Sequence, residues 1–296
     1  MTQRSQRHHE IPIWLQTHFC QDDRKTLWLG VKATRQIVQV GVNEAFVRRN
    51  ANTRIDYSRG KDGVVVPVKS DRDEKILARF DADAASADRR LIALAREWQR
   101  FGSTETPFSP EDLEICKRII LAQFRRTRES QDEIGLTSDD VDLHLDLLFQ
   151  RAEEQGQDLP SRQALVEAPG VRNVLAELSQ NHRANFASAD HPILADKEQE
   201  FLQSHGLRLA VVTASAGELI IGSHGVTILE ATLGQDTWLP LAPDVAIALS
   251  AQPRKTIIST HTRDFVEAHN LAVLSASDYV AASSREVVER AFKALD

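Results

Sequence analysis

Two adjacent histidines near the start of the chain, His8 and His9, are the first residues whose type suits chemistry. An imidazole titrates near neutral pH and binds metals in its neutral form, so either could serve as a general base or a metal ligand. The alternative is structural: a histidine here would hydrogen-bond the backbone and fix how the chain enters the helix that follows.

A basic cluster is the second candidate. Three arginines lie within residues 125–128, at the end of a segment with helical periodicity, and they must cover more than one face of that helix. The planar guanidinium of Arg126 suits bidentate contact with a phosphate or a carboxylate, so this local basic site could receive a nucleotide or a nucleic acid. The alternatives are an internal ion pair with a C-terminal acid such as Glu267, or a solvated helix end.

Ser223 and His224 lie between two glycines, Gly222 and Gly225. Adjacent side chains diverge in a strand, so these two cannot pair with each other there, although each could meet a group from elsewhere. The glycines allow either a tight turn that brings the backbone close to a ligand or an ordinary hairpin turn.

Asn270 lies in a C-terminal segment whose apolar residues have helical spacing. An inward amide in such a helix must be hydrogen-bonded. It would either face a ligand or clamp another segment of the chain, such as the N-terminal one.

The motifs of several large enzyme classes are absent, because the chain contains no G-x-x-x-x-G-K-[ST], G-x-G-x-x-G, H-E-x-x-H or G-x-S-x-G. P-loop NTPases, kinases, Rossmann dehydrogenases, zincins and typical α/β-hydrolases therefore fit poorly. A divalent metal would prefer carboxylate oxygens, and the candidate positions supply no complete set of ligands. The cofactor stays unassigned, with a divalent metal as one option.

Composition restricts the class of protein further. The 296 residues are 42% hydrophobic and 27% charged, with a formal net charge of -7, and this acidic balance argues against unspecific coating of DNA. No apolar run approaches the roughly 20 residues needed to cross a bilayer. Cys20 and Cys116 form neither a disulfide framework nor a CxxC metal site. We expect a cytoplasmic protein that does not bind membranes, and the oligomeric state is left open.

Hydrophobic periodicity predicts an α+β fold in a single domain over residues 1–296, with a helical block roughly over residues 73–185. The predicted helices are 12–19, 73–101, 109–124, 137–149, 171–181, 262–275 and 284–295. The predicted strands are 26–31, 36–40, 207–213, 218–222, 226–230 and 245–249, and the third and fourth are expected to form a hairpin. The expected architecture is a central helical block enclosed by a small mixed or antiparallel sheet of N- and C-terminal strands.

Four motifs in order resemble the bacterial family catalogued as domain of unknown function 4238. His-His-Glu-Ile-Pro at residues 8–12 resembles its His-His-x-Ile-Pro opening, and Gln-Phe-Arg-Arg-Thr at 123–127 resembles its helical Gln-x-x-Arg-Thr motif. Pro-Leu-Ala-Pro at 240–243 resembles its Pro-Leu-Ser-Pro turn, and residues 270–280 resemble its Asn-led helix and Tyr-Val strand. The resemblance spans nearly the whole chain. It implies a fold and a family membership rather than an activity. It also favours His9 over His8 as the functional histidine and adds Gln123 to the candidate binding residues.

One position departs from the family pattern. The family places Ser-Asp-x-Pro-Val between a hairpin and the Pro-Leu-Ser-Pro turn, whereas residues 222–226 here read Gly-Ser-His-Gly-Val, with His224 in place of the acid. A rival match, Ser-Ala-Asp-His-Pro at residues 188–192, lies upstream of the hairpin, and spacing favours the first. If the family's acid is catalytic, this chain has lost or altered that role.

Two functions from different classes follow. The first is a hydrolase acting on a phosphate-containing substrate, a nucleotide or nucleic acid, at a pocket assembled from both ends and the middle of the chain. Its catalytic residues would be His9, Ser223 and His224, and its binding residues Gln123, Arg126 and Asn270. The alternative is a non-catalytic binding or regulatory protein in which the same polar residues are structural clamps, which the change to His224 favours.

Both functions depend on where these residues lie. We expect residues 8–19 to pack against the helix that carries Asn270, because five large apolar side chains in nine residues would otherwise form an exposed patch. A buried His, Arg or Asn is costly unless it is paired, hydrogen-bonded or facing water. We therefore expect a single cavity lined by His9, Arg126, Asn270 and at least one of Ser223 and His224.

Overall fold

A computed structural model of the chain has the predicted α+β fold. It describes residues 7–21, 25–49, 54–59, 65–70, 72–101, 109–127, 142, 145–146, 149–150, 152–156, 158, 161–167, 177, 179–181, 183–184, 186–188, 192–231, 234–250 and 256–295. The helices predicted at 137–149 and 171–181 lie largely outside the described residues.

A five-stranded mixed sheet forms the centre of the molecule, in the order β12-β7-β11-β10-β9. The strands are β7 (Gly206–Val212), β9 (Thr227–Ala231), β10 (Gly234–Ala242), β11 (Val245–Ser250) and β12 (Thr256–His261). Only the β12–β7 pair is parallel. Every residue of β11 is buried, as expected for a central strand covered on both faces.

A second, four-stranded antiparallel sheet joins the two ends of the chain, as predicted. Its order is β3-β2-β13-β8, with β2 (Thr26–Val31), β3 (Gln36–Gly41), β13 (Tyr279–Ala282) and β8 (Ile221–Gly222). The sequence predicted β2 and β3 as separate strands, and the structure pairs them as a hairpin. The pairing of β2 with β13 connects residues about 250 positions apart.

The hairpin predicted for residues 207–213 and 218–222 is wrong. Strand β7 pairs with β11 and β12, and β8 pairs with β13 in the other sheet. The 3₁₀ turn η2 (Ala214–Ala216) redirects the chain between them. An apolar run predicts a buried strand, but the strand with which it pairs depends on which sheet edge the chain reaches in the folded protein.

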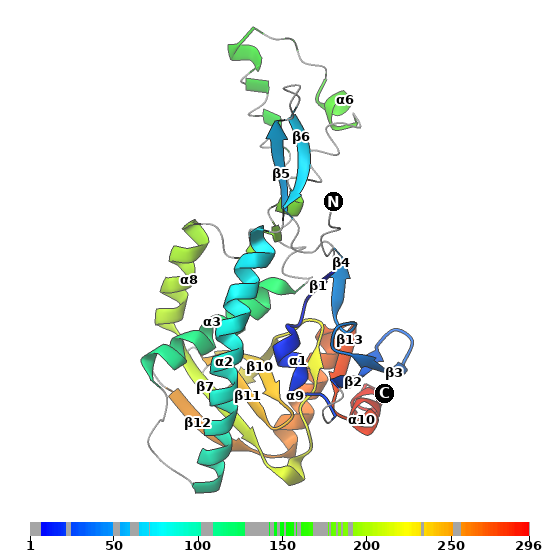
Figure 1. Ribbon diagram of the computed structural model, residues 1–296, viewed down its shortest axis with the longest axis vertical. Coiled ribbons are helices and arrows are strands. Elements are labelled where there is room, and N and C mark those ends of the chain that lie inside the picture. The colour runs from blue at the N-terminus through cyan, green and yellow to red at the C-terminus, as the bar shows by residue number, and fades with distance from the viewer. Residues whose placement is uncertain are drawn as a thin grey trace.

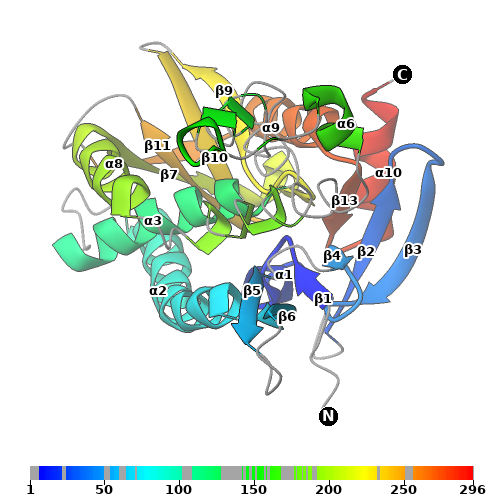
Figure 2. The same ribbon diagram turned by 90° about the horizontal axis from the view of Figure 1, so that it is seen from above.

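Helices cover both faces of the central sheet. Helices α2 (Arg72–Phe101) and α3 (Pro110–Arg126) pack on one face, and α9 (Arg263–Ala276) packs on the other (Figures 1 and 2). Helix α10 (Arg285–Lys293) lies against α9 and the second sheet. Ser109 accepts a hydrogen bond from the Asp112 amide and so caps the N-terminus of α3, at the residue where the sequence predicted a helix to begin.

The remaining elements lie around this layered body. Strands β1 (Arg7–His9) and β4 (Val47–Arg49) pair near the N-terminus, and α8 (Pro192–Ser204) packs against α3. The β5–β6 hairpin (Arg54–Arg59 and Val65–Ser70) and α6 (Arg162–Glu167) extend away from the two sheets in Figure 1.

The N-terminal segment is packed into the main core, but not where the sequence analysis placed it. Helix α1 (Ile13–Thr17) contacts α2, and Ile11, Leu15 and Phe19 are fully buried in the cluster that α2 and α3 form with the central sheet. The expected partner, α9, lies on the opposite face of that sheet. Ile11, Leu15 and Phe19 are therefore covered in this cluster, whereas Ile13 stays exposed.

Candidate functional site

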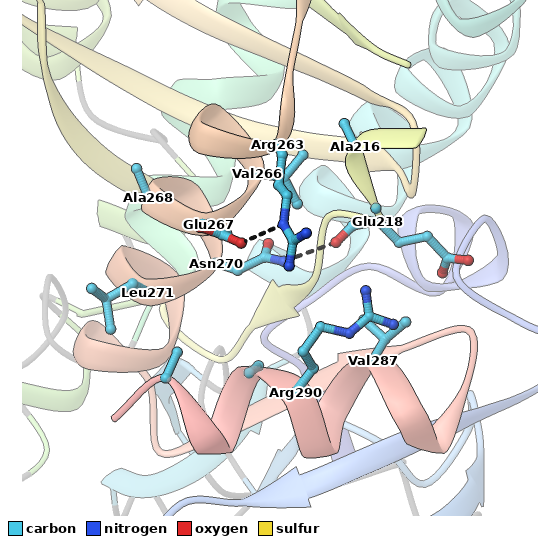
Figure 3. A pocket seen from close by; sticks show the side chains of 13 residues that line it. Ala216, Glu218, Arg263, Val266, Glu267, Ala268, Asn270, Leu271, Val287 and Arg290 are labelled. Carbon is cyan, nitrogen blue, oxygen red and sulfur yellow. Dashed lines mark hydrogen bonds and ion pairs between the residues drawn. The ribbon is translucent and has the colours of Figure 1, made fainter. Parts of the chain in front are cut away.

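The six candidate residues lie in separate places, so the single cavity expected from the sequence is not formed. His9 and Arg126 line one cavity, and Gln123 lies one turn before Arg126 on α3. Ser223 and His224 lie in the turn after β8. Asn270 lines a second cavity, beside α10 (Figure 3).

The turn after β8 uses its polar groups internally. The hydroxyl of Ser223 accepts hydrogen bonds from the amides of Asp278 and Tyr279, at 3.1 and 3.3 Å. His224 donates from Nδ1 to the Val226 carbonyl at 2.7 Å. The Ser223 contacts attach the turn to the start of β13, and the His224 contact closes the turn on itself, so both side chains have a structural role in this conformation.

Asn270 clamps the segment between η2 and β8. Its Oδ1 accepts from the Ile220 amide at 3.0 Å, and its Nδ2 donates to the Glu218 carbonyl at 2.8 Å. Both ends of the amide are therefore occupied by backbone. These two bonds hold the segment that the sequence analysis placed in a hairpin on its path to the second sheet.

Gln123 joins three parts of the chain. Its Nε2 donates to the Glu10 carbonyl at 2.9 Å, and its side chain lies against Gly225. A Cβ atom at Gly225 would lie 2.4 Å from Nε2 of Gln123, and the φ of +77° at Gly225 also disfavours any other residue. A close approach of the backbone was one of the two options that the sequence left open for this turn, and it exists here toward Gln123. Gln123 is therefore a positioning residue.

Arg126 and His9 share a cavity of 210 Å³ between the N-terminal segment and α2, which we call the N-terminal cavity. Its lining residues are His9, Pro12, Ile13, Trp14, Glu74, Leu77, Asp81 and Arg126. Two of the resembling motifs, more than a hundred residues apart in the chain, meet at this cavity.

Arg126 is the buried cation of the N-terminal cavity, with only 4% of its side chain exposed. Its Nη2 lies 2.8 Å from Oδ1 of Asp81 in an ion pair, and this oxygen also accepts from Nε1 of Trp14. Neither Nε nor Nη2 of Arg126 has hydrogen-bond geometry toward any described residue. A guanidinium offers five N–H donors, and leaving buried donors unsatisfied is costly. Arg126 is thus a buried cation beside the cavity; Asp81 already pairs with its Nη2, and Nε has no partner among the described residues.

The two histidines point in different directions because they are neighbours in strand β1. His8 is buried and its Nδ1 lies 2.8 Å from Oε2 of Glu74. His9 is the one that lines the N-terminal cavity with Arg126. The preference for His9 in the sequence analysis therefore agrees with its position.

Glu74 and Asp81 are the cavity residues that the sequence analysis missed. They occupy positions i and i+7 on α2, which places both carboxylates on one helix face. The sequence signal was present, but the periodicity of this helix was used only to find its apolar face. Their side chains are 42% and 29% exposed, so they form the solvent-facing part of the cavity.

A serine–histidine pair on β12 was also missed. The Ser259 hydroxyl lies 2.7 Å from Nε2 of His261, two residues along the same strand face. Burial and, less strongly, the nearby Arg208 guanidinium lower the pKa of His261, because both disfavour the imidazolium form. Arg208 is itself paired with Asp236 at 2.6 Å. Ser259 and His261 line neither the N-terminal cavity nor any other cavity described for the chain.

Two further properties concern the described part of the chain. No group of three or more His, Cys, Asp or Glu side chains there is arranged to hold a metal ion. Among the same residues, no helix combines the length and the apolar character needed to cross a membrane.

The chain belongs to the family described as Protein of unknown function (DUF4238), which it matches over residues 7–287. The family resemblance inferred from the four motifs is thereby confirmed. No curated protein and no solved structure matches the chain.

Proposed function

We propose that the protein binds a phosphate-containing small molecule in the N-terminal cavity and hydrolyses it there. The observation that carries this proposal is the burial of Arg126 in the lining of the cavity, where Asp81 is the one carboxylate paired with it among the described residues. A buried, planar guanidinium binds phosphate through two parallel hydrogen bonds.

The size and charge of the protein favour a nucleotide over a polynucleotide. A cavity of 210 Å³ accommodates a phosphoryl group with a small part of its ester. Binding along a nucleic acid needs many basic contacts, and the net charge of -7 opposes it. A cytoplasmic location fits the two free cysteines, Cys20 and Cys116.

In the proposed reaction, His9 is the general base. It would accept a proton from a water molecule whose oxygen attacks phosphorus, while Arg126 stabilises the charge on the phosphoryl oxygens. The bond between phosphorus and the ester oxygen breaks, and the departing oxygen takes a proton from solvent. Ser223, His224 and Asn270 have no part in this step, because their side chains are engaged in structural hydrogen bonds outside the N-terminal cavity.

A binding or regulatory protein without catalysis is the second candidate. It is favoured by the internal hydrogen bonds of Gln123, Ser223, His224 and Asn270, which act as clamps. The two candidates share the anion at Arg126 and differ only in turnover.

The test combines calorimetric titration with inorganic phosphate and AMP and an assay of p-nitrophenyl phosphate hydrolysis. Arg126→Gln should weaken phosphate binding roughly 10- to 150-fold, the equivalent of one or two charge-assisted hydrogen bonds. Arg118→Gln is the matched control, because Arg118 lies on the same helix in an exposed pair with Glu114. It should bind as the wild type does.

His9→Gln separates the two candidates. Under the hydrolase proposal it retains phosphate binding and loses turnover, with an unchanged circular dichroism spectrum. Binding by the wild type without any turnover would establish the regulatory alternative. A folded wild type that binds neither phosphate nor AMP would refute both.

A further inference from the structure

A second cavity, of 330 Å³, lies between η2 and helices α9 and α10 (Figure 3). We call it the α9–α10 cavity. It exists because small side chains occupy the positions where the two helices face each other: Ala268 on α9, Ala291 on α10, and Ala294 directly after α10. Larger apolar residues at these positions would close the space between the helices.

The walls of the α9–α10 cavity are apolar, and its charges gather at one end. Val266 and Leu271 of α9 and Val287 of α10 supply apolar surface. Arg263 of α9 and Arg290 of α10 both line the cavity, and Figure 3 shows the Arg290 side chain extending from α10 into it. Its Nη1 lies close to Gly217.

The two arginines differ in their partners. Nε of Arg263 lies 2.7 Å from Oε1 of Glu267, one helical turn later. The other acid in the lining, Glu218, accepts a hydrogen bond from the Ser283 hydroxyl. Arg290 makes no ion pair and no hydrogen bond with any residue that the structure describes. Arg290, an exposed residue, is therefore the arginine of the lining without an ion-pair partner among the described residues, and Glu218 is the carboxylate without one.

We propose that the α9–α10 cavity binds a small amphipathic carboxylate, with its carboxylate on Arg290 and its apolar body against Val266, Leu271 and Val287. One guanidinium matches one carboxylate in geometry and charge. A doubly charged phosphate is less suitable, because Glu218 and Glu267 also line the cavity. The volume suits an apolar body of roughly six to eight carbons.

This site is independent of the N-terminal cavity. The two share no lining residue, and Arg126 lies on the opposite side of the central sheet from α9. Asn270 contributes its aliphatic surface to the lining while its amide holds the backbone of residues 218–220.

The test is calorimetric titration of the full chain with octanoate. Saturable binding is expected with a dissociation constant below about 1 mM. Octanamide, which has the same apolar body without the charge, should bind at least tenfold more weakly. Butyrate should also bind more weakly, since each buried methylene contributes up to about fourfold in affinity.

Two variants test whether octanoate binds in the α9–α10 cavity. Arg290→Gln should weaken octanoate binding at least tenfold, whereas Arg285→Gln, an exposed position on the same helix paired with Glu289, should not change it. Ala268→Leu, at an exposed position of the lining, should fill the space and abolish binding. Thermal unfolding confirms that each variant is folded.

The possible results are distinct. Loss of octanoate binding in Arg290→Gln and Ala268→Leu, with Arg126→Gln and Arg285→Gln unaffected, supports the proposal. No saturable binding by the folded wild type, equal binding of octanoate and octanamide, or equal losses in Arg285→Gln and Arg290→Gln would overturn it. None of these results depends on phosphate binding at Arg126.

Discussion

Acidification should destabilise the protein through one histidine, His269. This residue lies on α9 and is fully buried, 5.9 Å from Phe265 between ring centroids. Neither of its ring nitrogens has hydrogen-bond geometry toward a described residue. Burial lowers its pKa to about 4, because an imidazolium there would lose its hydration, and the neighbouring Asn270 opposes this effect only partly.

The size of the effect follows from the two pKa values. An unfolded chain has a histidine pKa of 6.5, against about 4 in the folded protein, which corresponds to about 3 kcal/mol of stability. The folded pKa is the lower one, so the unfolded state binds more protons between these values. The contribution of His269 is therefore fully present above pH 6.5, falls as the pH drops from 6.5 to about 4, and is lost below that.

Urea unfolding of the wild type and of His269→Phe at pH 7 and pH 4.5 measures this effect. Phenylalanine is apolar, similar in size and compatible with the adjacent Phe265. The free energy of unfolding should fall by about 2.5 kcal/mol more in the wild type than in the variant. Other titrating groups act equally in both proteins and cancel. Equal losses in the two proteins would refute the assignment to His269.

Two glycine substitutions test the contacts that position the sites. Gly225→Ala should lower the free energy of unfolding by about 2–3 kcal/mol, from the strain of a positive φ and the displacement of Gln123, and should weaken phosphate binding. An unchanged urea midpoint would contradict this. Gly30→Ala places a Cβ 2.7 Å from Cζ of Phe292 and should lower the free energy of unfolding by about 1–3 kcal/mol, measured by thermal unfolding. Gly41→Ala is its control, because a Cβ at Gly41 meets no atom within 4 Å. Equal melting temperatures for these last two variants would show that α10 moves without cost.

The elements of this fold could largely be predicted from the sequence because their signals are local. Helix α2 follows from apolar residues at spacings of three and four, and α3 begins where Ser109 and the proline after it predict an N-cap. The β2–β3 hairpin joins strands separated by a short turn. The pairing of β8 with β13 was not predicted, because it connects edges that meet only after the central sheet has formed.

The residues of the candidate site were likewise only partly predictable from the sequence. The residue types and motifs of the sequence were sufficient to select His9 and Arg126, which do share a cavity. They were not sufficient to separate these from Asn270 or Ser223, whose hydrogen-bonding groups are taken up by backbone about 50 residues away in the chain. A polar side chain can bind a ligand only with donors or acceptors that the fold leaves unused. The sequence alone determined which groups were available, and the tertiary structure decided which of them were already occupied, because hydrogen-bond partners come from segments that only folding brings together.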